Sequence, residues 1–170
     1  DRENSDQNID VPNMWEQKKA DERAAKAKEL GQAQPSVLDG VIGGLPATTR
    51  ALKLQKRAAR VGFDWPELSQ VIDKVDEEIS EFKELLPIDK TISEDHRDSL
   101  EAELGDILFA VINAARHLGI DPERALRATN RKFEYRFHVV EQDIDKMGKT
   151  PDQTTLDEME VSWQRAKSAG

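Results

Sequence analysis

The sequence predicts an all-α protein with a four-helix-bundle-like core and flanking helices. Residues that favour helices, chiefly Ala, Leu, Glu, Lys, Arg and Gln, dominate the 170 positions. Apolar residues recur at spacings of three and four along successive segments, as one face of an α-helix requires. We find neither the alternating pattern of a strand nor the turn signals of a hairpin. These three observations exclude a sheet-based fold.

The composition limits the classes of function and of site that this protein can have. The net charge of −9 disfavours binding to a nucleic acid polymer, which needs clustered Lys and Arg. The absence of cysteine excludes disulfides, thiolate zinc sites and Cys nucleophiles, and is compatible with a cytoplasmic location. No apolar stretch approaches the length of a membrane span, and no signal peptide is visible. The chain opens with Asp1, as a fragment of a longer protein would.

The first 44 residues read as a polar tail or linker with one helix. Residues 1–10 are polar and aperiodic, whereas 12–30 are charged and Ala-rich and end at Gly31, a natural helix stop. Residues 31–44 hold four glycines and one proline, which is typical of a flexible connection. We therefore expect residues 1–44 to be a tail or linker and residues 45–170 to form the main domain.

The first two core helices have clear boundaries. Pro46 fits the first turn of one helix, and Gly62 fits its end. Asp64, followed three residues later by Glu67, resembles a capping box that starts the next helix. That helix carries apolar residues at helical spacing until Pro87 ends it.

Three further helices follow. Ser93 can cap a helix that runs to about Leu118, and Asp121 can cap another that ends near Gly148. Thr155 with Glu158 indicates a last, short helix. Inside the first of these, the apolar run over 107–112 is expected to be deeply buried.

Two acidic clusters carry the most chemical information. Glu78 and Glu81 are three residues apart on one helix, and Glu103 and Asp106 are three apart on the next, so each pair shares a face. If these helices pack antiparallel, the four carboxylates converge and need a cation, for which hard oxygen ligands favour Mg²⁺ or Mn²⁺. A solvated acidic face is the alternative. The position of these acids at the edge of apolar stripes favours the metal site.

Two cations and three aromatic residues also suit a nucleotide ligand, but they are weaker evidence than the acidic clusters. Lys132 and Arg136 are four apart and share a helix face, which suits a polyphosphate. Spacing alone favours two surface cations, paired with Glu134 or Glu141. Phe63, Trp65 and Trp163 are candidates for stacking on a base. By themselves they read as packing residues.

At this point the sequence resembles the MazG nucleotide pyrophosphohydrolases. That family's pattern is EExxE, a spacer and ExxD, which here is Glu77-Glu78-x-x-Glu81 and Glu103-x-x-Asp106. The GFDW, ARHLG and NRKFEYRF contexts make the match specific. The resemblance runs from about residue 45 to 163, and is closest to the second domain of MazG proteins that have two.

The resemblance implies a site and an assembly. Glu78, Glu81, Glu103 and Asp106 match the family's Mg²⁺ ligands. The residues that match segments or positions contacting the nucleotide are Lys74, Glu77, Lys132, Arg136 and Trp163. The family belongs to the all-α NTP pyrophosphatase superfamily, with dUTPases, acts on NTPs and dNTPs, and forms homodimers or higher homo-oligomers.

The implied reaction is Mg²⁺-dependent hydrolysis between the α- and β-phosphates, giving a nucleoside monophosphate and pyrophosphate. Glu77, or one of the metal-binding carboxylates, is the candidate group that accepts a proton from the attacking water or orients it. Two alternatives stay open. One is a non-enzymatic helical dimerisation module. The other is a more selective enzyme, either dUTPase-like or a phosphoribosyl-ATP pyrophosphohydrolase.

Overall fold

The all-α prediction is confirmed. The computed structural model describes residues 11–31, 33, 35–87 and 93–168, and this part of the chain contains helices and no strand. The tail predicted over residues 1–10 lies outside it. None of the described helices combines the length and the apolar composition that a bilayer span requires. The elements, in order, are α1 Val11–Glu29, α2 Ala47–Arg60, α3 Leu68–Glu84, α4 Glu94–His117, α5 Pro122–Lys146, the 3₁₀ turn η1 Pro151–Gln153 and α6 Leu156–Ser168.

Three of the predicted helix starts are confirmed by their caps. The Ser93 side chain accepts a hydrogen bond from the His96 N–H, and Asp121 accepts one from the Arg124 N–H. At α6, Glu158 donates its N–H to the Thr155 hydroxyl, and its carboxylate accepts from the Thr155 N–H. Each cap satisfies a backbone donor that the helix itself leaves unpaired.

The start of α3 differs from the prediction. Its N-cap is Glu67, whose N–H donates to the Gln70 side chain over 3.3 Å, so Asp64 is not the cap. Asp64 instead binds Arg116 and His117 at the end of α4. The two cations hold the Asp64 carboxylate against α4, and local sequence gives no sign of this long-range pairing. Similarly, Pro46 precedes the first turn of α2, which begins at Ala47.

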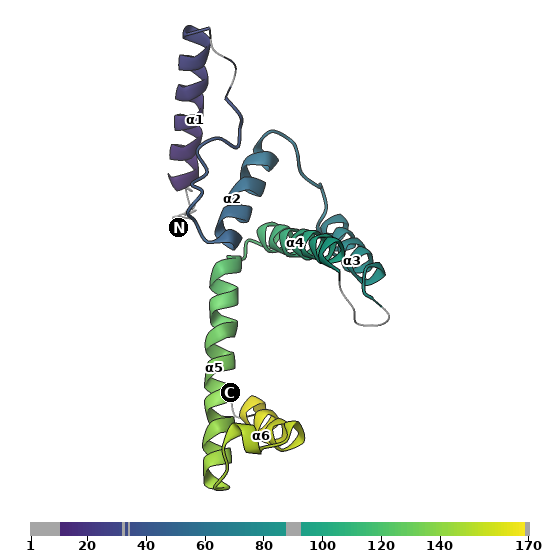
Figure 1. The fold of residues 1–170 in the computed structure, drawn as a ribbon. Coiled ribbons are helices and arrows are strands. Elements are labelled where there is room, and N and C mark those ends of the chain that lie inside the picture. The colour runs from purple at the N-terminus through teal and green to yellow at the C-terminus, as the bar shows by residue number, and fades with distance from the viewer. Residues whose placement is uncertain (1–10, 32, 34, 88–92, 169–170) are drawn as a thin grey trace, which may run out of the picture.

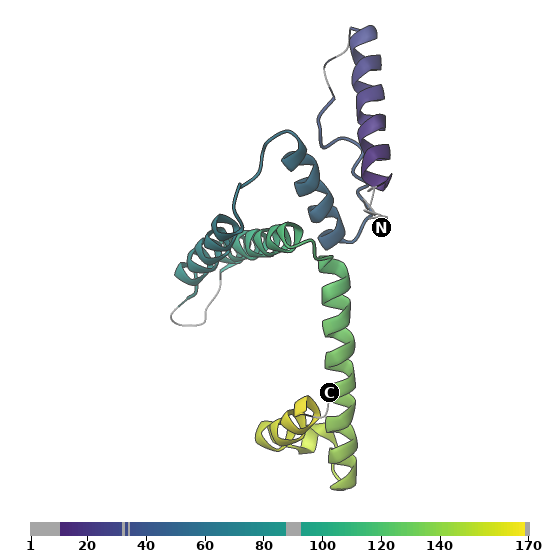
Figure 2. The same cartoon turned by 180° about the vertical axis from the view of Figure 1, so that it is seen from behind.

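The helices form an open arrangement within one chain. α3 and α4 lie side by side, and α2 packs against α4 (Figure 1). α5 begins where α2 and α4 meet and projects away from the α3–α4 pair, and α6 packs against its distant half (Figure 2). One chain therefore contains an α2–α3–α4 unit and a separate α5–α6 unit joined at the start of α5.

Burial along α4 is one-sided. Ala110 and Ile112 are buried, but Leu108 is 57% exposed and Val111 is 47% exposed, so the predicted deep burial of the whole 107–112 run is wrong for one chain. These side chains are exposed because α2 and α3 cover only part of the circumference of α4. Leu104, Leu108 and Val111 are spaced four and three apart and form an exposed apolar stripe. Stripes of this kind mark contact surfaces.

Candidate metal centre

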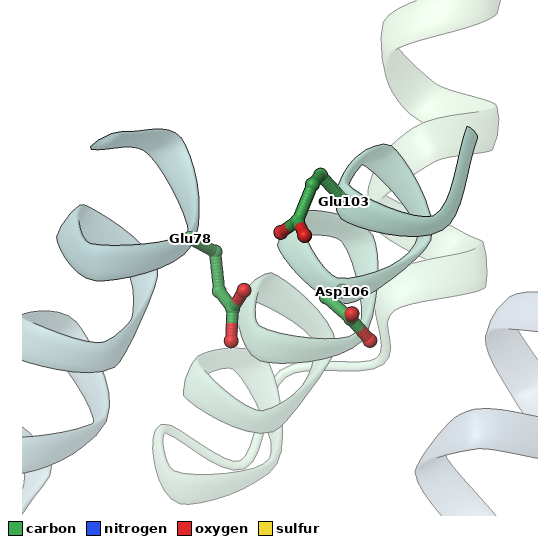
Figure 3. Close-up of side chains that lie close together, drawn as sticks. All are labelled: Glu78, Glu103 and Asp106. Carbon is green, nitrogen blue, oxygen red and sulfur yellow. The ribbon is translucent and has the colours of Figure 1, made fainter. Parts of the chain in front are cut away.

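Three carboxylates meet between α3 and α4. Glu78, Glu103 and Asp106 each offer one oxygen, and these oxygens lie within 4.8 Å of one another. Figure 3 shows Glu78 extending from α3 toward Glu103, with Asp106 one turn further along α4. The spacing of three residues places Glu103 and Asp106 on one face, and the packing of α3 on α4 brings Glu78 opposite them.

The surroundings of Glu78 favour a bound cation. Glu78 is only 7% exposed, so its charge needs a partner. Lys74 Nζ lies 2.9 Å from Glu78 Oε1 and 2.9 Å from Glu77 Oε1, and hydrogen bonds to Glu78 and then Glu77 raise the pKa of Lys74. One ammonium group cannot balance Glu103 and Asp106 as well. The cluster keeps a negative charge and offers hard oxygen donors, which fits a divalent metal ion such as Mg²⁺.

Glu81 and Glu77, also predicted at this site, lie at its edge. The carboxylate of Glu81 is outside the group within 4.8 Å. The pKa of Glu81 is nevertheless raised by desolvation and by the like charges of Glu78 and Glu103, so it is close enough to feel the cluster. Glu77 is exposed and is held by Lys74. Both side chains are exposed to solvent.

The remaining predicted residues lie elsewhere in the chain. Lys132 and Arg136 belong to α5, and Trp163 belongs to α6, which packs against α5. Trp163 contacts Phe133 with ring centroids 5.3 Å apart, so within one chain it has the packing role of the simpler interpretation. These three residues do not join the acids in one chain, because α5 carries them away from α3 and α4 (Figure 1).

A cavity of about 370 Å³ adjoins the acids. It lies between α2, α3 and α4, with Glu78 and Asp106 in its wall, and Leu54, Phe109 and Ala110 give it an apolar lining. Its size is at the lower end of the range for small-molecule sites. An acidic centre that opens onto an apolar cavity suits a ligand with one charged end and one flat, less polar end.

Polar residues that the sequence analysis missed lie at the other end of this cavity. Asn113 and Arg116 line it together with Asp64. Burial acts to raise the pKa of Asp64, but hydrogen bonds from Arg116 and His117 outweigh it and the pKa is lowered. The sequence contained one sign of this polar end: Asn113 is a polar residue in line with the buried face of an apolar helix segment.

Fold and site together define a class: a helical protein with a cluster of carboxylates, able to hold a metal ion, at the rim of a cavity. Residues 67–140 match the family model described as the MazG nucleotide pyrophosphohydrolase domain. This region contains Glu78, Glu103 and Asp106. The chain therefore contains a MazG nucleotide pyrophosphohydrolase domain, as the sequence motifs predicted.

Individual relatives agree with this match. The chain is 45% identical over 153 residues to the nucleoside triphosphate pyrophosphohydrolase of Escherichia coli strain K12, covering 90% of this chain and 54% of that protein. It is 36% identical over 155 residues to the nucleoside triphosphate pyrophosphohydrolase/pyrophosphatase MazG of Thermotoga maritima, covering 91% of this chain and 54% of the relative. The chain thus spans about half the length of these curated relatives.

Proposed function

We propose that this chain is the catalytic part of a Mg²⁺-dependent nucleoside triphosphate pyrophosphohydrolase. It would cut NTPs and dNTPs between the α- and β-phosphates. The observation that carries the proposal is the meeting of Glu78, Glu103 and Asp106 within 4.8 Å, inside the region that matches the MazG domain. The names of the relatives from E. coli and T. maritima support the same reaction.

Four carboxylates would hold the metal in this proposal. Glu78, Glu103 and Asp106 form the centre, and Glu81 would turn toward it from the next turn of α3. All four offer hard oxygen ligands, which suit Mg²⁺ first and also Mn²⁺. When bound, the metal would screen the phosphate charge and make water more acidic at neutral pH.

The side chains around the centre have separate roles. The oxygen of water forms a bond to the α-phosphorus, the bond from this phosphorus to the bridging oxygen breaks, and pyrophosphate leaves. Glu77 would accept the proton of the water, and Lys74, which contacts both Glu77 and Glu78, would keep Glu77 in position. Lys132 and Arg136 would balance the charge that develops on pyrophosphate.

A second copy of the chain would complete this site. Lys132, Arg136 and Trp163 lie on the α5–α6 unit, away from the acids of their own chain. The exposed stripe along α4, defined above, offers an apolar surface on which another copy can pack. We propose a homodimer as the smallest such assembly, in which Trp163 of one copy stacks on the base bound by the other.

The other parts of the proposal concern the setting of the enzyme. Residues 45–170 would form the catalytic domain, and residues 1–44, including α1, would be a tail or linker. A net charge of −9 argues against a nucleic acid polymer as partner. An enzyme of free nucleotides would act in the cytoplasm.

The test is a product analysis. The purified chain is incubated with a panel of NTPs and dNTPs, with Mg²⁺ or with EDTA, in heavy-oxygen water. Monophosphate plus pyrophosphate is expected only with Mg²⁺, and the heavy oxygen should appear in the monophosphate because attack is at the α-phosphorus. Glu103→Gln should abolish turnover. Glu101→Gln, an exposed glutamate on the same helix, is the matched control. Label in pyrophosphate, or diphosphate plus orthophosphate, would contradict the proposed bond.

A further inference from the structure

The cavity between α2, α3 and α4 has a neutral polar side chain, Asn113, on the face of α4 that carries Asp106. Asn113 lies in its wall and is only 6% exposed. A carboxamide carries one acceptor and one NH₂ donor, and which of them faces a ligand depends on the partners of the other. The partners of Asn113 therefore decide which group this side chain presents to a ligand.

Those partners fix the carboxamide in one orientation. Arg116 Nε donates to Asn113 Oδ1 over 2.8 Å, and Arg116 is itself held by Asp64. Arg116 has no acceptor atom, so it can only bind the oxygen of the carboxamide. Within the described part of the chain, the NH₂ group of Asn113 donates to no other residue. Asn113 thus offers the cavity a donor and not an acceptor.

The position of Asn113 relative to the acids matches the length of a nucleotide. Asp106 and Asn113 are seven residues apart on α4, which is two turns along one face and on the order of 10 Å. Ala110 lies between them, and Phe109 adds an apolar wall. A ligand whose phosphates lie at Asp106 would extend its ribose over Ala110 and its base toward Asn113.

We propose that this cavity is the nucleobase subsite and that Asn113 is a specificity-determining residue. Its NH₂ group donates to a carbonyl oxygen on the base, so bases with a keto group are preferred over those with an amino group at the same position. An amino group there would face the NH₂ group, donor against donor. This inference rests on the proposed function. It places the base in the chain that supplies the acids and leaves its outer face to Trp163 of a second copy.

The test compares nucleotides that have a keto group or an amino group at this position. UTP is paired with CTP, and ITP with ATP, and kcat/KM is measured for each. The keto base forms a neutral hydrogen bond where the amino base places two donors face to face. This difference predicts that kcat/KM is about tenfold higher for the keto nucleotide. Binding of the α,β-imido analogues of UTP and CTP, measured by calorimetry, gives a second readout that needs no turnover.

Two variants separate base reading from structural damage. Asn113→Asp replaces the donor by an acceptor of the same shape and should invert the preference toward CTP and ATP. Arg116→Gln releases the carboxamide of Asn113, which can then rotate. The ratio of kcat/KM between keto and amino nucleotides should therefore fall toward one without inverting. Arg116 is in this sense a positioning residue.

The outcomes distinguish this inference from the proposed function. Hydrolysis of all four nucleotides with equal kcat/KM, unchanged in Asn113→Asp, would overturn the base assignment and leave the reaction intact. Absence of turnover with a keto preference in analogue binding would support the base assignment and contradict the proposed reaction. If neither analogue binds, the cavity is not a nucleotide site.

Discussion

A shared active site makes a quantitative prediction about mixtures of inactive variants. Glu103→Gln removes a metal ligand, and the double variant Lys132→Ala/Arg136→Ala removes both phosphate-binding cations. Each protein alone should be inactive. If acids and cations of one site come from different chains, a mixed dimer regains one intact site. Both defects then fall in its other site.

The size of the recovery follows from the symmetry of a dimer. Random exchange of equal amounts gives mixed dimers as half of the total, and each holds one working site out of two. The mixture should therefore reach about a quarter of the wild-type activity per chain. If both halves of the site came from one chain, as they would in a closed single-chain bundle, every site in the mixture would carry a defect and no activity would return.

The assay follows pyrophosphate release after the two variants have been incubated together. Exchange of chains is verified independently, with one variant carrying a mass tag, so that lack of exchange cannot be mistaken for lack of complementation. Replacing Glu103→Gln by Glu101→Gln gives the control, since this chain keeps both halves of its site. Verified exchange without recovered activity would refute the shared site.

Three further outcomes test single side chains. Glu77→Gln should lower kcat by roughly 10²–10⁴-fold if Glu77 is the base, and full kcat in this variant would remove it from the mechanism. Gly105→Ala should stabilise the isolated chain by about 0.5–1 kcal/mol in denaturant unfolding, because an added Cβ meets nothing within 4 Å and Gly weakens a helix interior; a destabilised variant would mean that a second copy packs there. Hydrogen bonds from Lys149 and from the Thr155 N–H lower the pKa of Glu158 from 4.5 to about 2. The ionised Glu158 therefore stabilises the folded state fully above pH 4.5, and this stabilisation is lost as the pH falls toward 2. Glu158→Gln should lower Tm at pH 7, and the difference from wild type should shrink over that range; a constant difference would contradict the pKa.

Features encoded locally were predicted well. The caps at Ser93, Asp121 and Thr155 depend on residues three positions apart, so the sequence contains both partners. Asp64 shows the limit of this approach. It has the local pattern of a cap, but the competing partners Arg116 and His117 are about fifty residues away in the chain.

The candidate metal centre could be predicted from the sequence only in part. Helical periodicity predicted that Glu103 and Asp106 share a face, and the structure places them so. The contribution of Glu78 needed the further assumption that α3 packs against α4, which their connection favours. Asn113 could not be assigned a role from sequence, because its meaning depends on the orientation that Arg116 gives to its carboxamide.

The sequence by itself determined the helices, most of their ends and the pairing of acids along each helix, because hydrogen bonds and side-chain spacing within a helix reach only three or four residues. Only the tertiary structure decided which faces are covered and which residues meet. It separates Lys132, Arg136 and Trp163 from the acids, and it leaves the stripe along α4 exposed. Burial depends on what packs against a helix, and this is fixed by contacts between distant segments rather than by the helix's own sequence.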